Sequence, residues 1–286
     1  MNPYDAGEIR AMLSKSGFTF SKSMGQNFLI DENVPRKIAD EAGIDSSCGV
    51  LEVGPGIGSL TVRLAERAGR VVAVELDRRL LPILRKTLED RGSVEVVQGD
   101  ILKLDIAELV SERFHGLKPA VCANLPYNIT TPLIARLVDA GIFGTMTLMV
   151  QREVALRICA APGSADYGAF SVYMAYHTVP EILFDVPPEA FMPRPKVTSA
   201  VIRLTRRDAP ACEIRDRELF FRVVRAAFAQ RRKTLVNALA ASFGDRLSKA
   251  GIGEIIRSCG FDEKIRGETL GVPAFAAIAD QMRERL

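Results

Sequence analysis

The chain has 286 residues, of which 48% are hydrophobic and 26% charged, and its net charge is +3. This composition is typical of a soluble globular protein with one large core and room for a second, smaller domain. No apolar stretch approaches the roughly 18 residues that cross a bilayer, and the first residues lack a targeting pattern, so we expect a cytoplasmic protein. The five cysteines form no C-x-x-C pair, which excludes a zinc knuckle and a disulfide framework.

Strands and helices alternate along the chain up to Leu204. The apolar runs predict strands over 49–53, 70–75, 94–98, 119–123, 145–151, 181–186 and 198–204. The amphipathic stretches predict helices over 59–66, 78–89, near residue 106, over 131–140 and over 153–160. This alternation predicts an α/β fold with a mostly parallel sheet of about seven strands, covered on both faces. The last two strands have no long helix between them, so we expect an antiparallel pair at one edge of the sheet.

Beyond Thr205 the apolar pattern has a helical period. Helices are predicted over 218–229, 233–243, 252–259 and 273–285. The stretch 208–211, with a proline and small residues, predicts a boundary there. The chain therefore divides into an α/β domain over residues 1–207 and a helical domain over residues 208–286. No internal repeat is present, which excludes a solenoid.

Three glycines follow the first predicted strand, at positions 54, 56 and 58. Because they lack a Cβ atom, Gly54, Gly56 and Gly58 let the backbone approach a ligand closely. A dinucleotide-binding turn has the pattern G-x-G-x-x-G, whereas a single residue separates Gly56 from Gly58 here. This spacing disfavours a nicotinamide cofactor.

Two acids close the second and third predicted strands. Glu75 lies 21 positions after Gly54, where a doubly wound sheet places a carboxylate that accepts hydrogen bonds from a ribose diol. Asp100 ends the third strand, where its side chain could accept from the exocyclic amine of adenine. Either acid could instead cap a following helix.

The run Asn124-Leu125-Pro126-Tyr127 stands at the end of the strand predicted over 119–123. This order suits a site that holds the planar amino group of a nucleobase for methyl transfer. The alternative is an ordinary turn, since Asn and Pro are common turn residues.

Segments at four strand ends resemble the motifs of the S-adenosylmethionine-dependent methyltransferases: 52–58, 75–77, 99–100 and 124–127. Three longer segments are similar to those of the ribosomal RNA adenine N6-dimethyltransferase family: 23–29, 124–129 and 191–197. Within the family the resemblance is to the small-subunit (16S) enzymes, which dimethylate two adjacent adenosines in a hairpin loop near the 3′ end of that RNA. The resemblance spans the chain.

This resemblance implies a Rossmann-like class I methyltransferase fold over residues 1–207, with S-adenosylmethionine as methyl donor, S-adenosylhomocysteine as product and no metal. It implies small-subunit rRNA in an immature 30S-type subunit as partner, a helical domain that binds RNA or the ribosome, and a monomer. The cofactor-binding positions that match are Asn27, Leu29, Gly54, Glu75, Asp100 and Asn124. Gln26 lies in the same segment as Asn27, and Gly56 lies in the same turn as Gly54, so both join this set.

The predicted mechanism follows from the electronics of adenine, whose N6 lone pair is delocalised into the ring. Acceptors at the N6 hydrogens favour the tetrahedral nitrogen that attacks the sulfonium methyl. Asn124 supplies one acceptor, and the carbonyl of Leu125, held extended by Pro126, supplies another. Tyr127 would stack on one face of the base and Phe191, in a proline-stiffened loop, on the other. The alternative for Phe191 is a core phenylalanine.

Basic residues gather between Arg203 and Lys233, where ten Lys and Arg stand against four Asp and Glu. Such clustering is the usual electrostatic footprint of a phosphate backbone. The triple cluster Arg231, Arg232 and Lys233, which begins or interrupts a helix, is the predicted RNA-binding site, and a solvated helix end is the alternative. Two rival functions stay open: a large-subunit (23S) rRNA adenine N6-methyltransferase and a non-catalytic ribosome assembly factor.

Overall fold

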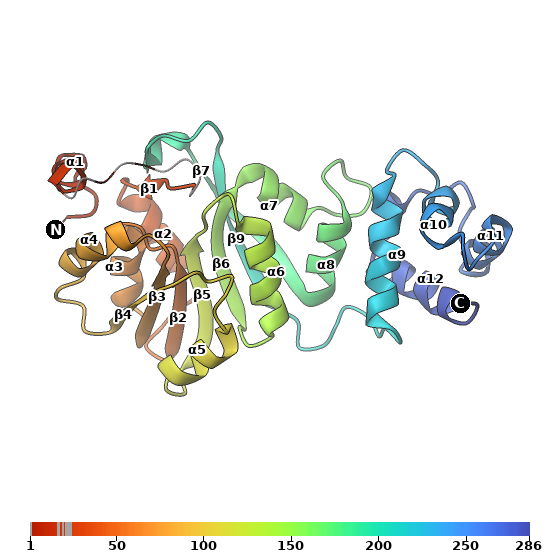
Figure 1. The fold of residues 1–286 in the computed structure, drawn as a ribbon, viewed down its shortest axis with the longest axis horizontal. Coiled ribbons are helices and arrows are strands. Elements are labelled where there is room, and N and C mark those ends of the chain that lie inside the picture. Colours follow the sequence, from red (N-terminus) through yellow and green to blue (C-terminus); the bar gives the residue numbers. More distant parts are fainter. Residues whose placement is uncertain (1, 16–17, 19, 21–24) are drawn as a thin grey trace. The chain divides into compact units, whose positions relative to one another are not determined.

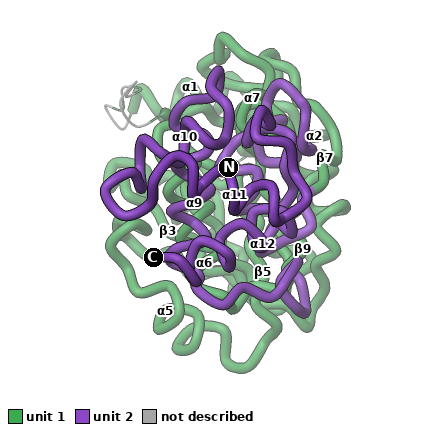
Figure 2. Tube along the Cα trace, turned by 90° about the vertical axis from the view of Figure 1, so that its right-hand side faces the viewer, with its two compact units in different colours: residues 1–155, 181–206 green, residues 156–180, 207–286 purple. Residues whose placement is uncertain are grey.

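The computed structural model describes residues 2–15, 18, 20 and 25–286 (Figure 1). Residues 23 and 24, which belong to the predicted segment 23–29, lie outside the described residues. The chain forms two compact units, drawn in different colours in Figure 2. Unit 1 comprises residues 1–155 and 181–206, and unit 2 comprises residues 156–180 and 207–286.

Unit 1 is built on a seven-stranded sheet with the order β4-β3-β2-β5-β6-β9-β7. The strands are β2 (Cys48–Val53), β3 (Arg70–Glu75), β4 (Val94–Gln98), β5 (Lys118–Asn124), β6 (Thr145–Gln151), β7 (Thr178–Val186) and β9 (Ser199–Arg206). Strands β2 to β6 pair in parallel, and β9 runs antiparallel to β6. The predicted α/β fold with a mostly parallel seven-stranded sheet is confirmed, and β9 and β7 are neighbours at its edge as expected.

Both faces of the sheet are covered. Val50 and Leu51 are consecutive residues of β2 and both are fully buried. Because successive side chains of a strand point to opposite faces, apolar atoms must cover each face. On one face, Val50 and Val71 pack with Ile38 and Leu64 of the neighbouring helices. The helices of this unit are α1 (Ala6–Lys15), α2 (Asn33–Glu41), α3 (Ser59–Ala65), η2 (Arg78–Leu80), α4 (Leu81–Thr87), α5 (Ile106–Arg113), α6 (Thr130–Ala140) and η3 (Pro188–Ala190).

A second, two-stranded sheet joins the N-terminal region to the loop before β9. Strand β1 (Phe28–Leu29) pairs antiparallel with β8 (Phe191–Met192), with Leu29 opposite Phe191. Phe191 is 3% exposed and belongs to the apolar cluster that contains Leu29 and Ala190. The pairing holds residues 28–29 beside the core of unit 1, in a region for which the sequence predicted no strand.

Unit 2 is helical, and it contains the four helices that were predicted beyond residue 205. Its helices are α8 (Ala169–His177), α9 (Arg217–Ala229), α10 (Leu235–Phe243), α11 (Lys249–Ser258), η4 (Gly267–Thr269) and α12 (Val272–Arg283), and α7 (Arg152–Cys159) begins in unit 1 and ends in unit 2. Asp216, Thr234 and Ser248 cap α9, α10 and α11 by accepting a backbone N–H in the first turn. Helix α8 and the short η4 were not predicted from the sequence, and neither were α1 and α2 of unit 1.

The segment 156–180 belongs with unit 2, whereas the sequence predicted a single boundary after residue 207. The segment belongs there because it packs around Tyr167, which is 1% exposed. The Tyr167 hydroxyl donates to the Leu270 carbonyl over 2.9 Å. Val172 and Tyr176 of α8 are buried in the same apolar cluster as Phe220 of α9. Within the described residues, no helix is both long enough and apolar enough to span a membrane.

Candidate functional site

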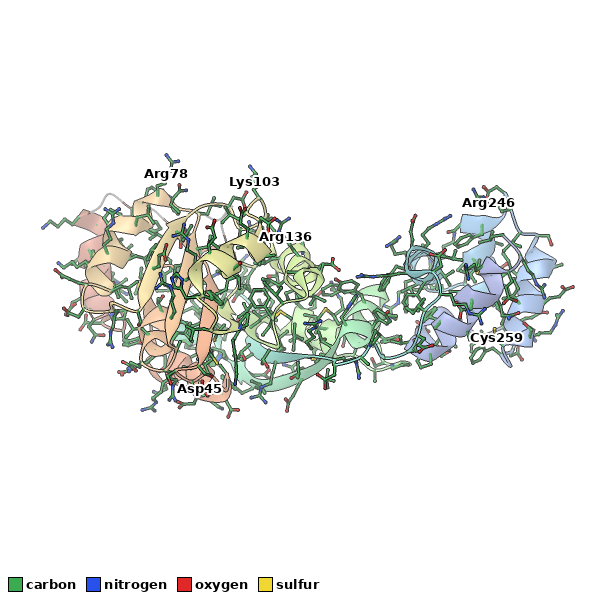
Figure 3. The ribbon with its side chains drawn as sticks, turned by 90° about the horizontal axis from the view of Figure 1, so that it is seen from below. Asp45, Arg78, Lys103, Arg136, Arg246 and Cys259 are labelled. Carbon is green, nitrogen blue, oxygen red and sulfur yellow. The ribbon has the colours of Figure 1, made fainter. Side chains whose placement is uncertain are left out.

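A cleft lies at the carboxyl ends of strands β2, β3, β4 and β5, and the N-terminal segment 25–29 forms one of its walls. It encloses about 1230 Å³, counting the open space at its mouth. In Figure 3, Arg78 and Lys103, which follow β3 and β4, lie at one edge of the sheet, and Asp45, which precedes β2, lies at the opposite edge. Open parallel sheets bind their ligands at this carboxyl edge.

The cleft brings together most of the predicted site residues. Those that line it are Gln26, Asn27, Leu29, Gly54, Gly56, Glu75, Asp100, Asn124, Leu125, Pro126 and Tyr127. They come from five separate stretches of the chain, and the parallel sheet is what gathers them.

The glycine turn between β2 and α3 has the left-handed backbone that favours glycine. Gly54 and Gly56 have φ values of 67° and 62°. A Cβ atom on Gly56 would lie 2.9 Å from the Phe28 ring, and one on Gly54 would lie 3.3 Å from Pro126. The turn is therefore closely packed against both the segment 25–29 and the run 124–127, which keeps the walls of the cleft near each other.

Glu75 is a buried carboxyl group at the end of β3, with 5% of its surface exposed. Its Oε2 accepts from the Gly56 N–H over 3.2 Å, and its Oε1 accepts from the Asp77 N–H over 2.8 Å. Burial raises the pKa of Glu75 to about 7. Each carboxylate oxygen accepts up to two hydrogen bonds, so the group has the capacity to bind a diol as well.

Glu52 is a second buried acid, and it begins the segment 52–58, for which only the glycines had a predicted role. It lines the cleft, is 1% exposed, and its Oε2 has no hydrogen-bond partner in the described part of the chain. Burial raises the pKa of Glu52 to about 8, and the nearby carboxyl of Glu75 acts in the same direction. A buried carboxyl group with one unpartnered oxygen at a cleft wall is suited to a hydrogen-bond donor or cation of a ligand.

Asp100 both caps a turn and lines the cleft. Its Oδ1 accepts from the Leu102 N–H over 3.0 Å, and its Oδ2 lies 3.8 Å from the Lys103 ammonium. The alternative role of Asp100 as a cap therefore applies to Oδ1 and leaves Oδ2 available. Its side chain is 30% exposed, so the carboxylate remains accessible from the cleft.

Two apolar residues that were not predicted as site residues complete this end of the cleft. Leu76 is 51% exposed, although leucine is usually buried, and Ile101 lies beyond the next strand. Each residue directly follows one of the acids, Glu75 or Asp100. Their position directly after an acid that ends a strand could have identified them from the sequence. Together, the two side chains provide apolar walls for a flat ring.

The run 124–127 forms the opposite end of the cleft. The Asn124 amide nitrogen donates to the Asn27 carbonyl over 3.1 Å, so its Oδ1 is the side-chain atom suited to accept from a ligand. The Leu125 N–H donates to the Met149 carbonyl over 3.0 Å, and the Tyr127 hydroxyl and Ser199 Oγ are 2.7 Å apart. Burial raises the pKa of Tyr127, which is therefore neutral at physiological pH. These bonds fix the backbone and the aromatic ring from outside the cleft.

Phe191 is not among the residues that line the cleft. Its ring packs in the core beside Leu29 and Ala190, as the alternative interpretation of this residue expected. The cause is the pairing of β1 with β8, which directs the ring into the core of unit 1.

The basic cluster 231–233 lies in unit 2, in the turn between α9 and α10. The prediction that it begins or interrupts a helix is therefore wrong. Helix α9 ends at Ala229, and Thr234 caps α10. All three side chains of the cluster are exposed. Arg231 also donates to the Ala165 carbonyl over 2.8 Å, which anchors one end of the turn.

Comparison with known proteins gives a consistent result over almost the whole chain. The family model described as ribosomal RNA adenine dimethylase matches residues 17–257. The ribosomal RNA small subunit methyltransferase A of Alkaliphilus oremlandii is 46% identical over 281 residues, covering 98% of this chain and 97% of that protein. The protein of the same name from Pelotomaculum thermopropionicum is 48% identical over 279 residues, covering 95% of this chain and 94% of that protein.

Solved structures share the fold. A dimethyladenosine transferase from Plasmodium falciparum has a TM-score of 0.74 at 24% identity, covering 90% of this chain and 98% of that one. The 23S rRNA methyltransferase ErmE has a TM-score of 0.68 at 26% identity, covering 90% of this chain and 99% of that one. Together with the family match and the near-full-length identities, these similarities show that the chain belongs to the ribosomal RNA adenine dimethylase family.

Proposed function

We propose that this protein transfers methyl groups from S-adenosylmethionine to N6 of two adjacent adenosines in a hairpin loop near the 3′ end of small-subunit (16S) rRNA. The products are N6,N6-dimethyladenosines and S-adenosylhomocysteine, formed in the cytoplasm during ribosome biogenesis. One observation carries the proposal: a single cleft has a buried carboxyl at the end of β3 and the run Asn124–Tyr127 at the end of β5. The first suits a nucleoside ligand and the second suits a base amino group.

The residues of the cleft fit the methyl donor. Glu75 accepts from the ribose hydroxyls, Leu76 and Ile101 contact the two faces of the adenine, and Asp100 accepts from its amino group. Glu52, whose Oε2 is unpartnered within the described residues, accepts from the ammonium of the methionine part, and Asn27 and the Gly54 backbone line the same region. When bound, the donor supplies an electrophilic methyl group on a sulfonium sulfur. No metal takes part in this reaction.

The run 124–127 activates and holds the target base. Asn124 Oδ1 and the Leu125 carbonyl accept from the two N6 hydrogens, which localises the nitrogen lone pair for attack on the methyl carbon. Tyr127 stacks on the base, with its hydroxyl held by Ser199. After transfer, N6 loses a proton to solvent, so a strong general base is unnecessary. Fixing both reactants in one cleft contributes up to about 7–11 kcal/mol in favourable cases.

Phe191 has a supporting place in this proposal. It holds Leu29 through the pairing of β8 with β1, and Leu29 lines the cleft. A stacking role for Phe191 on the second face of the base requires its ring to leave the core cluster.

The RNA is held partly outside the cleft. The exposed cluster Arg231, Arg232 and Lys233 contacts phosphates and sets the register of the RNA, without reading bases. The target adenosine must leave its stack, because N6 within a helix cannot reach a donor in a cleft. Loops of RNA meet this requirement. The partner is an immature 30S-type subunit, and the enzyme acts as a monomer.

The choice of the small subunit rests on the relatives. Relatives named as ribosomal RNA small subunit methyltransferase A are 44% to 48% identical, against 26% for the 23S rRNA methyltransferase ErmE. The test is incubation of the protein and labelled donor with immature small subunits and, separately, with large-subunit rRNA. We expect label in the small-subunit RNA. Label in the large-subunit RNA alone overturns the choice, and label in neither favours the non-catalytic assembly factor.

A further inference from the structure

Asp77 is a buried carboxylate that lies beside the cleft without lining it. Its side chain is 4% exposed. Its Oδ2 accepts from the Gln26 amide nitrogen over 2.9 Å, and its backbone N–H donates to Glu75 Oε1 over 2.8 Å. One residue therefore connects the N-terminal wall of the cleft to the carboxyl group at the end of β3. Neither the sequence motifs nor the proposed mechanism uses this link.

We propose that Asp77 is a positioning residue for the cofactor, which holds Gln26, and with it the segment 25–29, against the strand end that carries Glu75. The inference rests on the proposed function, since the ligand of this cleft is taken to be S-adenosylmethionine. Asp77 itself does not touch that ligand. It acts through Gln26 on one side and through Glu75 on the other.

Helix capping does not account for Asp77. Its Oδ1 does accept from the Arg79 N–H over 3.1 Å and so caps η2. Asp105 performs the same task on α5, where its Oδ1 accepts from the Glu108 N–H over 3.0 Å, and Asp105 is exposed. Capping thus needs one oxygen and no burial. Asp77 is buried and directs its other oxygen to a side chain 51 positions away in sequence.

Arg79 keeps this buried carboxylate charged. Its Nε donates to Asp77 Oδ1 over 2.9 Å and its Nη2 donates to Oδ2 over 2.7 Å, a two-point contact between guanidinium and carboxylate. These bonds, and then the one from Gln26, lower the pKa of Asp77. The Arg79 guanidinium also lies over the Phe18 ring, 4.9 Å from its centroid. The ion pair is therefore packed against the N-terminal region, and it presents a charged acceptor to Gln26.

The segment 25–29 is held at other points along its length. The Asn27 carbonyl accepts from the Asn124 amide, and the Leu29 carbonyl accepts from the Ser59 hydroxyl over 2.8 Å. The bond between Gln26 and Asp77 fixes the part of the segment nearest the residues proposed to bind the ribose. Loss of that bond loosens one wall of the cofactor site and leaves the run Asn124–Tyr127 in place.

The first test is the affinity of the full-length protein for S-adenosylmethionine, measured by titration calorimetry. We expect Asp77→Ala to weaken binding about tenfold, because a hydrogen bond to a charged group is lost. In methylation assays the loss should appear in KM for the donor, with kcat at saturating donor largely retained. Asp105→Ala removes a capping carboxylate that does not line the cleft and serves as the matched control, with unchanged affinity expected.

A double-mutant cycle with Gln26→Ala tests the link itself. If Asp77 acts through Gln26, the loss of binding free energy in the double variant is smaller than the sum of the losses in the two single variants. Additive losses would show that the two residues act independently and would overturn the proposal.

The pH dependence of donor binding distinguishes the proposed role from simple helix capping, because loss of a cap would not change the pH midpoint of binding. Glu52 and Asp100 line the same cleft as Glu75, and Arg79 pairs with Asp77. Burial is the main cause of the raised pKa of Glu75, and the negative charge of Asp77 contributes to it. Asp77→Asn keeps the size of the side chain and removes the charge. It should shift the pH midpoint of donor binding to lower pH and weaken binding, since the amide has one acceptor oxygen to share between Gln26 and Arg79.

The outcomes separate the two claims. If the wild-type protein does not bind S-adenosylmethionine, the proposed function fails. If the wild type binds and Asp77→Asn has the same affinity and the same pH midpoint, the role of Asp77 is refuted while the function stands. Should Asp77→Ala fail to fold, the isosteric Asp77→Asn decides the question alone.

Discussion

The cleft of unit 1 and the turn 231–233 of unit 2 present their polar groups in opposite ways. In the cleft, Glu52 and Glu75 are almost fully buried, and backbone N–H groups fix Glu75. In the turn, three basic side chains are exposed to solvent. Buried groups in fixed positions recognise a small ligand by its shape and its hydrogen bonds, whereas exposed charges attract a phosphate backbone and depend on salt. Changes in the cleft should therefore alter the chemistry, and changes in the turn should alter the affinity for RNA.

The largest effect is expected at Asn124. Replacement of Asn124 by Ala removes the proposed side-chain acceptor for N6, and loss of one such electrostatic contact lowers a rate constant by about a hundredfold to a thousandfold. It also removes the bond to the Asn27 carbonyl. Methylation is measured with labelled donor under single-turnover conditions, and RNA binding in parallel. Turnover within a factor of two of the wild type would remove Asn124 from the site.

Glu52 should govern how stability depends on pH. Its pKa is raised from 4.5 to about 8 in the folded protein, so the unfolded chain releases this proton first. The free energy of unfolding should therefore fall as pH rises from about 4.5 to 8, by roughly 1.4 kcal/mol for each pKa unit. Glu52→Gln should remove this part of the decrease, and the part due to Glu75 should remain. Denaturant unfolding at pH 5 and pH 8.5 checks this, and identical decreases in both proteins contradict it.

The basic turn offers the complementary test. Replacement of Arg231, Arg232 and Lys233 by Ala should weaken RNA binding about tenfold at physiological salt. The slope of the logarithm of the binding constant against the logarithm of the salt concentration should fall by the amount that corresponds to about three phosphate contacts. The affinity for S-adenosylmethionine should not change. Replacement of three other exposed basic residues of unit 2, Arg246 (Figure 3), Lys249 and Lys264, by Ala removes the same charge and is the control. An equal loss of RNA binding in the control variant would mean that net charge matters and the turn does not.

The smallest effect is expected from the titration of Glu75. Because its pKa is raised to about 7, raising the pH from 6 to 8 converts it to the stronger, ionised acceptor. The affinity for S-adenosylmethionine should increase a few-fold over this range, as for a single ionisable group that strengthens a hydrogen bond. Glu75→Gln should bind more weakly and lose this dependence. A pH dependence that survives in Glu75→Gln would assign it to another group.

Much of the cleft was predictable because of the way parallel sheets are built. Once the strands predicted to end at Val53, Glu75, Gln98 and Ala123 were recognised, their carboxyl ends had to meet at one edge, and the residues there were expected to share a site. The order of the motifs then supplied the expected chemistry. The helices of unit 2 followed from their amphipathic period in the same manner.

The rest depended on contacts between distant segments, which periodicity does not reveal. The burial of Phe191 comes from the pairing of β8 with β1, and the link between Asp77 and Gln26 joins a strand end to the N-terminal segment. Helix α8 has apolar and aromatic residues on nearly every side, so it shows no helical period, and only its packing identifies it. The roles of Glu52 and Leu76 depend on how buried or exposed each side chain is, and the sequence alone does not specify this.

The most direct test of the account is a crystal structure of the protein soaked with S-adenosylmethionine. We predict that the donor occupies the cleft at the carboxyl ends of β2 to β5, with its ribose against Glu75 and its methyl group facing Asn124. A donor bound elsewhere, or a cleft closed by side chains with no room for the molecule, would contradict the account.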